Sequence, residues 1–93
     1  MDVNNERLTI IILTFNESLH IQRCIESVCS LNSRVVVVDS YSDDSTCDIA
    51  VELGADVYQN EFLTQAKQFQ WAVDNCDVTS DWVLRLDADE TID

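Results

Sequence analysis

Short apolar runs alternate along the chain with segments in which apolar residues recur at helical spacing. Residues 8–13 and 35–38 are almost continuously apolar and rich in Ile or Val, a pattern typical of strands covered on both faces. Weaker strand patterns occupy 56–59 and 82–86, where β-branched and aromatic residues favour extended structure. We expect Trp82, as a large aromatic residue, to serve packing. The sequence thus predicts four strands.

Three segments between these strands carry helical spacing. The first places four apolar residues on one helix face, at i, i+3, i+4 and i+7: Ile21, Cys24, Ile25 and Val28. The second repeats this spacing over 46–53 and is followed by Gly54, the residue type suited to a left-handed C-terminal cap. The third helix is predicted over 64–75 and is expected to bury Ala66, Phe69 and Val73.

Strands and helices therefore alternate along the whole chain, and its 93 residues allow one small domain. The alternation predicts right-handed crossovers and a parallel sheet. We expect the α/β class: a Rossmann-like, doubly wound parallel sheet with helices on both faces and strand order 3-2-1-4. In such sheets ligands bind beyond the carboxyl ends of the strands, where the winding direction reverses. That point falls between the first and fourth strands.

Polar and acidic residues follow each predicted strand. They occupy 14–17, 39–44, 59–60 and 87–90, and the parallel arrangement would gather them on one edge of the sheet. The only glycine is Gly54, so the chain contains neither a G-x-G-x-x-G turn nor a phosphate loop that ends in Gly-Lys. Two common nucleotide-binding motifs of this architecture are thereby excluded.

The charge balance limits the partners. The chain has 18 acidic and 5 basic side chains and a formal net charge of −13, which repels nucleic acid and anionic membrane surfaces. No apolar run approaches the ~18 to 20 residues that cross a bilayer, and the first residues lack the order of a secretory signal. We therefore expect a cytoplasmic protein. The four cysteines form no C-x-x-C pair, which argues for reduced thiols and against a zinc site.

Asp87 and Asp89 stand two residues apart at the end of the last predicted strand. In that position they can converge on one ion, and their hard oxygen atoms suit Mg²⁺ or Mn²⁺. A phosphate at ~4 Å from a carboxylate would cost about 4 kcal/mol at an effective dielectric of ~20, and a divalent cation reverses that sign. We expect Mg²⁺ or Mn²⁺ at this pair, bridging two phosphates.

Four motifs together carry a resemblance to a known family. They are Thr14-Phe15-Asn16-Glu17, Val37-Val38-Asp39-Ser40 with Ser42, Asp44 and Thr46 beyond it, Gly54-Ala55, and Trp82-Val83-Leu84-Arg85-Leu86-Asp87-Ala88-Asp89-Glu90. Over residues 8–90 the chain resembles the first half of a family 2 glycosyltransferase of the GT-A fold. The bacterial members that act in lipopolysaccharide or other surface-polysaccharide assembly are the most similar. A D-x-D motif alone is weak evidence for this family. Here the motif follows an apolar strand, and two other strand ends also match the family, so the combination is specific.

The resemblance implies an enzyme that transfers a sugar from a nucleotide diphosphosugar to a saccharide or lipid-linked acceptor, with a metal ion and with inversion. Thr14 and Phe15 fall where the family lines the nucleotide base, and Asp39 where it hydrogen-bonds that base. Lys67 lies in the helix from which relatives direct a polar or basic side chain toward the nucleotide sugar. The expected nucleotide-sugar-binding residues are Thr14, Phe15, Asn16, Glu17, Asp39, Lys67, Asp87 and Ala88, and the expected metal ligands are Asp87 and Asp89.

Several of these residues also have a purely structural interpretation. Phe15 either stacks on a base or packs, and Asp39 either contacts ligand or caps the following loop. Glu17 is expected to cap the first helix, and Asp43 and Asp44 to cap the second and favour its positive end.

The chain also departs from the family pattern. Residues 39–42 read D-S-Y-S where many relatives read D-D-G-S. The acceptor half, with the general base, has no counterpart here, so we expect a partial GT-A domain over 1–93 that binds the donor and lacks turnover alone. The complete enzyme would lie in the cytoplasm or at the inner face of the membrane. The open sheet edge after the fourth strand offers a site for self-association.

Two other functions compete with donor binding. Residues 87–91 satisfy the D-x-D-x-T signature of haloacid-dehalogenase phosphatases, in which Asp87 would be the nucleophile. That family places the motif on an early strand, which disfavours this hypothesis. The remaining alternative is a non-catalytic module with an acidic pocket.

Overall fold

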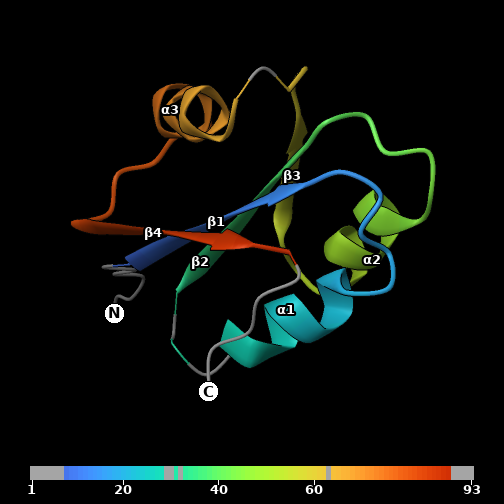
Figure 1. Ribbon diagram of the computed structural model, residues 1–93. Coiled ribbons are helices and arrows are strands. Elements are labelled where there is room, and N and C mark those ends of the chain that lie inside the picture. The colour runs from blue at the N-terminus through green and yellow to red at the C-terminus, as the bar shows by residue number, and fades with distance from the viewer. Residues whose placement is uncertain (1–7, 29–30, 32, 63, 89–93) are drawn as a thin grey trace.

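The computed structural model describes residues 8–28, 31, 33–62 and 64–88, and its centre is a four-stranded sheet (Figure 1). The strands are β1 (Leu8–Thr14), β2 (Arg34–Asp39), β3 (Asp56–Gln59) and β4 (Trp82–Asp87). They lie in the order β3-β2-β1-β4, and each neighbouring pair is parallel. The predicted strand order is confirmed, and every predicted strand boundary lies within one residue of the observed one.

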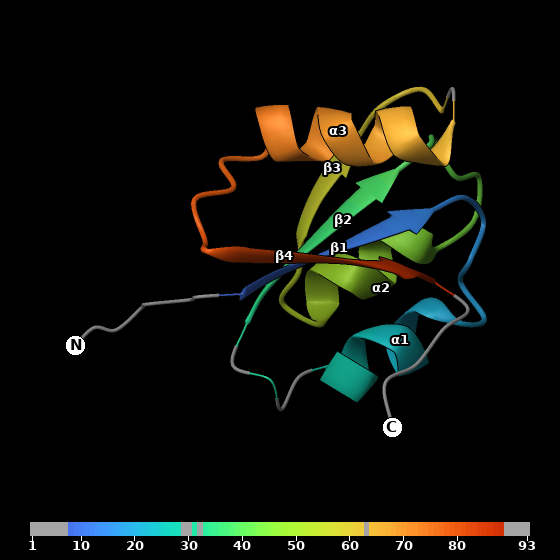
Figure 2. The ribbon, with the colours of Figure 1, turned by 60° about the vertical axis from the view of Figure 1, so that its left-hand side comes forward.

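Helices cover both faces of this sheet, as predicted for a doubly wound fold. Figure 2 shows α1 (Ile21–Val28) and α2 (Thr46–Glu52) below the sheet and α3 (Gln65–Asn75) above it. The helices bury one apolar cluster on each side of the sheet. The sheet therefore forms the middle of three layers.

Alternate residues of the central strands enter the two apolar clusters. Ile10 and Ile12 of β1 pack toward α1 and α2, whereas Ile11 packs toward α3, and all three side chains are fully buried. Val36 and Val37 divide in the same way in β2. Because both faces are covered, these strands read as continuous apolar runs and lack an alternating pattern.

The end of α2 confirms the predicted glycine cap. Gly54 has a φ of +91°, and its N–H donates to the carbonyl of Val51 over 3.0 Å. The next N–H, that of Ala55, donates to the carbonyl of Ala50 over 3.1 Å. These two bonds form a Schellman motif, which satisfies the last carbonyls of the helix and turns the chain into β3.

The buried face of α3 differs from the predicted one. Ala66 is exposed and Phe69 and Val73 are only half-buried, whereas Gln68 and Ala72 are fully buried. The helix turns Gln68 inward because its side-chain amide forms hydrogen bonds with Ser40 and Asn60. The prediction of a buried Ala66 was therefore wrong: apolar spacing cannot reveal a glutamine that is buried because its polar atoms are satisfied.

Arg34 fixes the far end of α3 against the start of β2. Its Nη1 donates to the carbonyls of Cys76 and Asp77 over 2.8 and 3.0 Å, and its Nε donates to Asp56 over 2.9 Å. Burial of the guanidinium alone would lower the pKa of Arg34. The hydrogen bonds to Asp56 and Tyr58 and the charges of these groups have the larger effect, so the pKa is raised. Arg34 and Gln68 thus hold the two ends of the helix.

Strand β4 lies at an edge of the sheet and pairs only with β1 among the described residues. Trp82 at its start is 71% exposed, because α1, α2 and α3 leave the first part of this strand uncovered. The expectation that Trp82 serves packing was wrong. The openness of this edge and self-association through it stay predictions.

Candidate functional site

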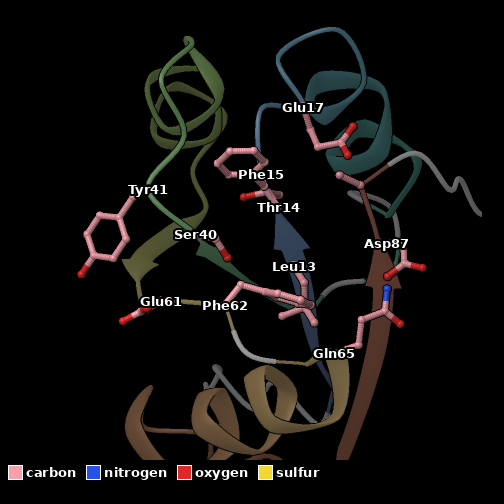
Figure 3. Close-up of a pocket in the computed structure, with 11 residues that line it drawn as sticks. Leu13, Thr14, Phe15, Glu17, Ser40, Tyr41, Glu61, Phe62, Gln65 and Asp87 are labelled. Atoms are coloured by element: carbon pink, nitrogen blue, oxygen red, sulfur yellow. The ribbon is translucent and has the colours of Figure 1, made fainter.

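A cleft of about 610 Å³ opens at the carboxyl ends of β1, β2 and β4 (Figure 3). This is the position at which the doubly wound topology predicts a ligand. Its lining combines apolar, aromatic and acidic side chains from four separate segments of the chain. The lining residues are Leu13, Thr14, Phe15, Glu17, Ser40, Tyr41, Glu61, Phe62, Gln65, Asp87 and Ala88.

The cleft brings together five of the predicted nucleotide-sugar-binding residues. These are Thr14, Phe15, Glu17, Asp87 and Ala88. The predicted metal ligand Asp89 lies outside the described residues. The other three predicted residues, treated next, do not line the cleft.

Asp39 is fully buried at the end of β2, and its carboxylate is occupied by neighbouring donors. The hydroxyl groups of Thr14 and Ser42 donate to Oδ1 over 2.7 and 2.5 Å, and the N–H of Ser42 donates to Oδ2 over 2.7 Å. Burial alone would raise the pKa of Asp39, but these hydrogen bonds outweigh it and lower the pKa. Asp39 thus caps the loop after β2, and its contact with a nucleotide base stays a prediction.

Asn16 joins the loop after β1 to the loop after β2. Its N–H donates to Oγ of Ser42 over 2.7 Å, and its Oδ1 accepts from the N–H of Asp43 over 2.8 Å. Asn16 has a φ of +52°, a conformation that asparagine tolerates better than most residues. In the described structure its side chain therefore links two loops, and it does not line the cleft.

Lys67 lies in the first turn of α3, where its side chain is exposed. The backbone N–H of Lys67 donates to the hydroxyl of Thr64, which caps this helix over 3.1 Å. The cap explains where the helix begins. The predicted contact of Lys67 with the nucleotide sugar stays a prediction.

Asp44 ties the start of α1 to the start of α2. Its Oδ1 accepts from the N–H of Thr46 over 3.0 Å and from the Thr46 hydroxyl, and its Oδ2 accepts from the N–H of Ser18 over 3.2 Å. The Thr46 hydroxyl in turn accepts from the N–H of Glu17 over 2.9 Å. The hydrogen bonds from Thr46 and Ser18 lower the pKa of Asp44 to about 2. The predicted capping role is confirmed for Asp44, which accepts from the first residue of α2. It was wrong for Asp43, whose carboxylate accepts no hydrogen bond within the described structure.

The low pKa of Asp44 predicts an effect of acid on stability. Because the folded-state pKa of about 2 lies below the ordinary 3.8, the stabilisation by Asp44 is complete above about pH 4 and is lost as the pH falls toward 2. We expect Asp44→Asn to be less stable than the wild type at pH 6, with the difference vanishing near pH 2. Urea unfolding at several pH values measures this difference.

Asp43→Asn is the matched control for this prediction. It removes the same charge one residue away, and within the described structure the carboxylate of Asp43 accepts no hydrogen bond. A stability difference for Asp44→Asn that does not shrink on acidification, or an equal difference for Asp43→Asn, would contradict the assignment.

Tyr41 occupies the glycine position of D-D-G-S, one of the two positions at which this sequence departs from that pattern. Its φ of +60° is a left-handed conformation that costs a residue with a Cβ about 1–2 kcal/mol. The bonds from Ser42 to Asp39 hold this turn in place. The turn therefore favours glycine sterically, and here it presents a half-exposed tyrosine ring at the rim of the cleft.

The cleft is acidic. Glu17, Glu61 and Asp87 line it, and none of the described lining residues is basic. The Nδ1 atom of His20 lies 3.1 Å from Glu17. Within the described residues no group of three or more His, Cys, Asp or Glu side chains could hold a metal ion. The donor atoms that Asp87 offers are hard carboxylate oxygens, which fit Mg²⁺ or Mn²⁺ and not a soft metal.

None of the described cysteines lines the cleft. Burial, with the nearby carboxylate of Asp39, raises the pKa of Cys47 to about 11, and burial raises that of Cys76 to the same value. Such thiols stay protonated at neutral pH and are poor nucleophiles. The described cysteines, Cys24, Cys47 and Cys76, are free thiols.

Sequence reasoning missed the wall of the cleft that follows β3. It stopped at residues 59–60, whereas Glu61, Phe62 and Gln65 also line the cleft. The available signal was that the carboxyl end of β3 lies on the same edge of the sheet as those of β1 and β2. Reading as far as six residues beyond each predicted strand would have found them.

No helix within the described ranges has the length and apolar character needed to cross a membrane. This agrees with the absence of a long apolar run in the sequence.

Comparisons with known proteins give a consistent result. The sequence model of the family described as glycosyl transferase family 2 matches residues 9–93. An uncharacterized glycosyltransferase of Rickettsia conorii is 41% identical over 87 residues, which cover 94% of this chain and 30% of that protein. The succinoglycan biosynthesis protein ExoA of Rhizobium meliloti is 37% identical over 91 residues, which cover 88% of this chain and 28% of that protein. The chain thus spans about 30% of the length of these relatives.

A solved structure shares the fold. Glucosyl-3-phosphoglycerate synthase from Mycobacterium tuberculosis, in complex with Mn²⁺, UDP and glucosyl-3-phosphoglycerate, matches with a TM-score of 0.76 and 20% identity. The match covers 90% of this chain and 34% of the synthase. At this identity the likeness shows the fold alone.

Proposed function

The chain belongs to glycosyl transferase family 2, and we propose that its cleft binds the donor of the transfer reaction, a nucleotide diphosphosugar. Its fold is the first part of the GT-A fold. The family assignment decides against the phosphatase hypothesis. Because the chain spans about 30% of its relatives, we infer that it is the donor-binding part of a GT-A domain whose acceptor-binding part is supplied by further sequence.

The observation that carries this proposal is the acidic cleft at the switch point between β1 and β4. Three carboxylates and no basic side chain line it among the described residues. A diphosphate in such a cleft is repelled unless a cation accompanies it. The related synthase binds both Mn²⁺ and UDP according to its description, which supports the same pairing here.

Asp87 and Asp89 are the residues that would hold Mg²⁺ or Mn²⁺. Such an ion neutralises the charge that develops on the departing diphosphate. The position of Asp87 in the lining of the cleft supports this role. Its backbone is held at the end of β4, where Cys24 Sγ donates to its carbonyl over 3.6 Å. Ala88, buried and part of the lining, allows close approach of the ligand beside this carboxylate.

Other residues of the chain would bind and orient the donor. Phe15, 54% exposed at the cleft, offers a ring on which a nucleobase can stack. Thr14 donates its hydroxyl to Asp39, and this bond fixes the floor of the cleft. Lys67 would reach the nucleotide sugar from the first turn of α3.

For the acceptor we propose a chemical class and no single compound. A saccharide or lipid-linked acceptor in surface-polysaccharide assembly fits the relative that is named for succinoglycan biosynthesis. The hydroxyl of this acceptor would attack the anomeric carbon with inversion, and the base that deprotonates it would come from the acceptor-binding part. A lipid-linked acceptor would place the complete enzyme on the cytoplasmic face of the membrane.

Calorimetric titration of the chain with UDP and GDP tests donor binding. We expect both nucleotides to bind in the presence of Mn²⁺ and to bind at least about tenfold more weakly when EDTA removes it, because the carboxylates then face the diphosphate directly. Circular dichroism controls for folding. Absence of Mn²⁺-dependent binding by the folded chain would leave the non-catalytic module as the better description.

A further inference from the structure

Two aromatic side chains face the cleft from opposite walls. Phe15 follows β1 and is 54% exposed, and Phe62 follows β3 and is 47% exposed. Figure 3 shows the ring of Phe62 directed into the cleft toward Leu13, the ring of Phe15 above it and Ser40 between them. A planar ligand that enters between these walls would bury apolar ring surface on both of its faces.

The wall that carries Phe62 is anchored by a buried glutamine. Gln68 is 1% exposed. Its Nε2 donates to the carbonyl of Asn60 over 3.0 Å and to the Ser40 hydroxyl over 3.2 Å, and its Oε1 accepts from Nδ2 of Asn60 over 2.9 Å. The N–H of Asn60 also donates to the carbonyl of Asp39 over 3.0 Å. The chain that leads into Phe62 is therefore fixed to the end of β2 before any ligand arrives.

The polar group expected to read the base is already engaged. Asp39 is fully buried and accepts three hydrogen bonds of 2.7 Å or less, from Thr14 and Ser42. A base could reach this carboxylate only by displacing donors that also hold the loop after β2. Aromatic ring surface is thus what the cleft offers to the flat face of a base.

We propose that the nucleobase of the donor is held between Phe15 and Phe62, and that Phe62 is a base-binding residue that acts by stacking. This inference rests on the proposed function. Every nucleobase has a π-face, so stacking tolerates different bases, whereas a site that reads a base by buried hydrogen bonds can discriminate by ~10⁴-fold or more. The affinities for UDP and GDP are therefore within about tenfold of each other.

Calorimetry on the full chain with Mn²⁺ tests this, with UDP, GDP and inorganic pyrophosphate as probes. Stacking on one aromatic residue changes affinity by about 5- to 150-fold on removal of the ring. Phe62→Leu keeps an apolar side chain, and we expect it to weaken the binding of UDP and of GDP by about tenfold. Pyrophosphate, which has no base, binds the variant within about twofold of the wild type, and Phe62→Trp restores nucleotide affinity.

Trp82→Leu is the matched control, because it removes an exposed ring at the start of β4, the end of the strand away from Asp87. We expect it to leave the affinities for UDP, GDP and pyrophosphate unchanged. Unchanged nucleotide binding by Phe62→Leu overturns the stacking proposal and leaves the proposed function intact. Equal weakening of nucleotides and pyrophosphate overturns it as well, since that pattern marks a merely structural role. A wild-type chain that binds neither nucleotides nor pyrophosphate overturns the proposed function itself.

Discussion

Replacement of Asp87 by asparagine is expected to weaken Mn²⁺-dependent binding of UDP or GDP by about 100-fold or more. Asparagine preserves the shape of the side chain but removes the charge of the one predicted metal ligand that the structure places in the cleft. Changes in the surroundings of metal ligands already reduce metal affinity by ~10- to 100-fold, and loss of a ligand charge acts on the ion directly. Calorimetry with Mn²⁺, with and without nucleotide, measures the effect.

Asp81→Asn provides the control for this experiment. Asp81 is exposed immediately before β4, and Asp87 is at the end of the same strand. Both variants change the net charge by the same amount, so a general electrostatic effect on the anionic ligand would appear equally in both. Retention of Mn²⁺-dependent binding by Asp87→Asn, with the Asp81→Asn variant unchanged, would contradict the assignment of Asp87 as a metal ligand.

Removal of the Asp39 side chain is expected to produce the largest loss of stability among the site residues. Asp39→Ala leaves the hydroxyls of Thr14 and Ser42 and the N–H of Ser42 without their buried acceptor. Each buried group that loses its partner costs about 1–3 kcal/mol. We expect Asp39→Ala to lower the free energy of unfolding by about 3 kcal/mol, measured by urea denaturation at pH 7.

Asp39→Asn separates charge from shape at this position. Its amide oxygen can still accept, but its NH₂ group faces donors, so we expect a loss between those of the wild type and Asp39→Ala. The lowered pKa of Asp39 means that its contribution is present at neutral pH and declines as the pH falls below about 4. An alanine variant as stable as the wild type at pH 7 would show that the hydrogen bonds around Asp39 contribute nothing net.

Much of the fold followed from the apolar pattern because both faces of the sheet are covered. Residues such as Ile11 and Val37 are buried whichever face they take, so the strands remained visible as continuous runs. The prediction failed where burial depends on polar partners or on the sheet edge. Gln68 is buried for its hydrogen bonds, and Trp82 is exposed because nothing in the described structure covers the start of β4.

The site was predictable only in part, for a related reason. The strand ends identified Thr14, Phe15 and Asp87, since topology alone places them together. Sequence could not show that Asp39 is enclosed by the donors of Ser42, because that enclosure depends on a left-handed turn at Tyr41. Phe62 was missed because the segment after β3 was followed only to residue 60, and sequence could not show that Gln68 anchors this segment through Ser40 and Asn60.

The pairing of β1 with β4 determines when the cleft comes into existence during folding. Leu8 lies beside Trp82 and Leu13 beside Asp87, so the first and last described strands must meet before the cleft has both of its sides. Closing so long a loop costs more entropy than joining neighbours in the chain, and non-local pairing of this kind slows folding. In a ribosome-bound nascent chain, β1, β2 and β3 would be available to associate before β4 emerges, and the cleft therefore gains its β4 side only after that strand has left the ribosome.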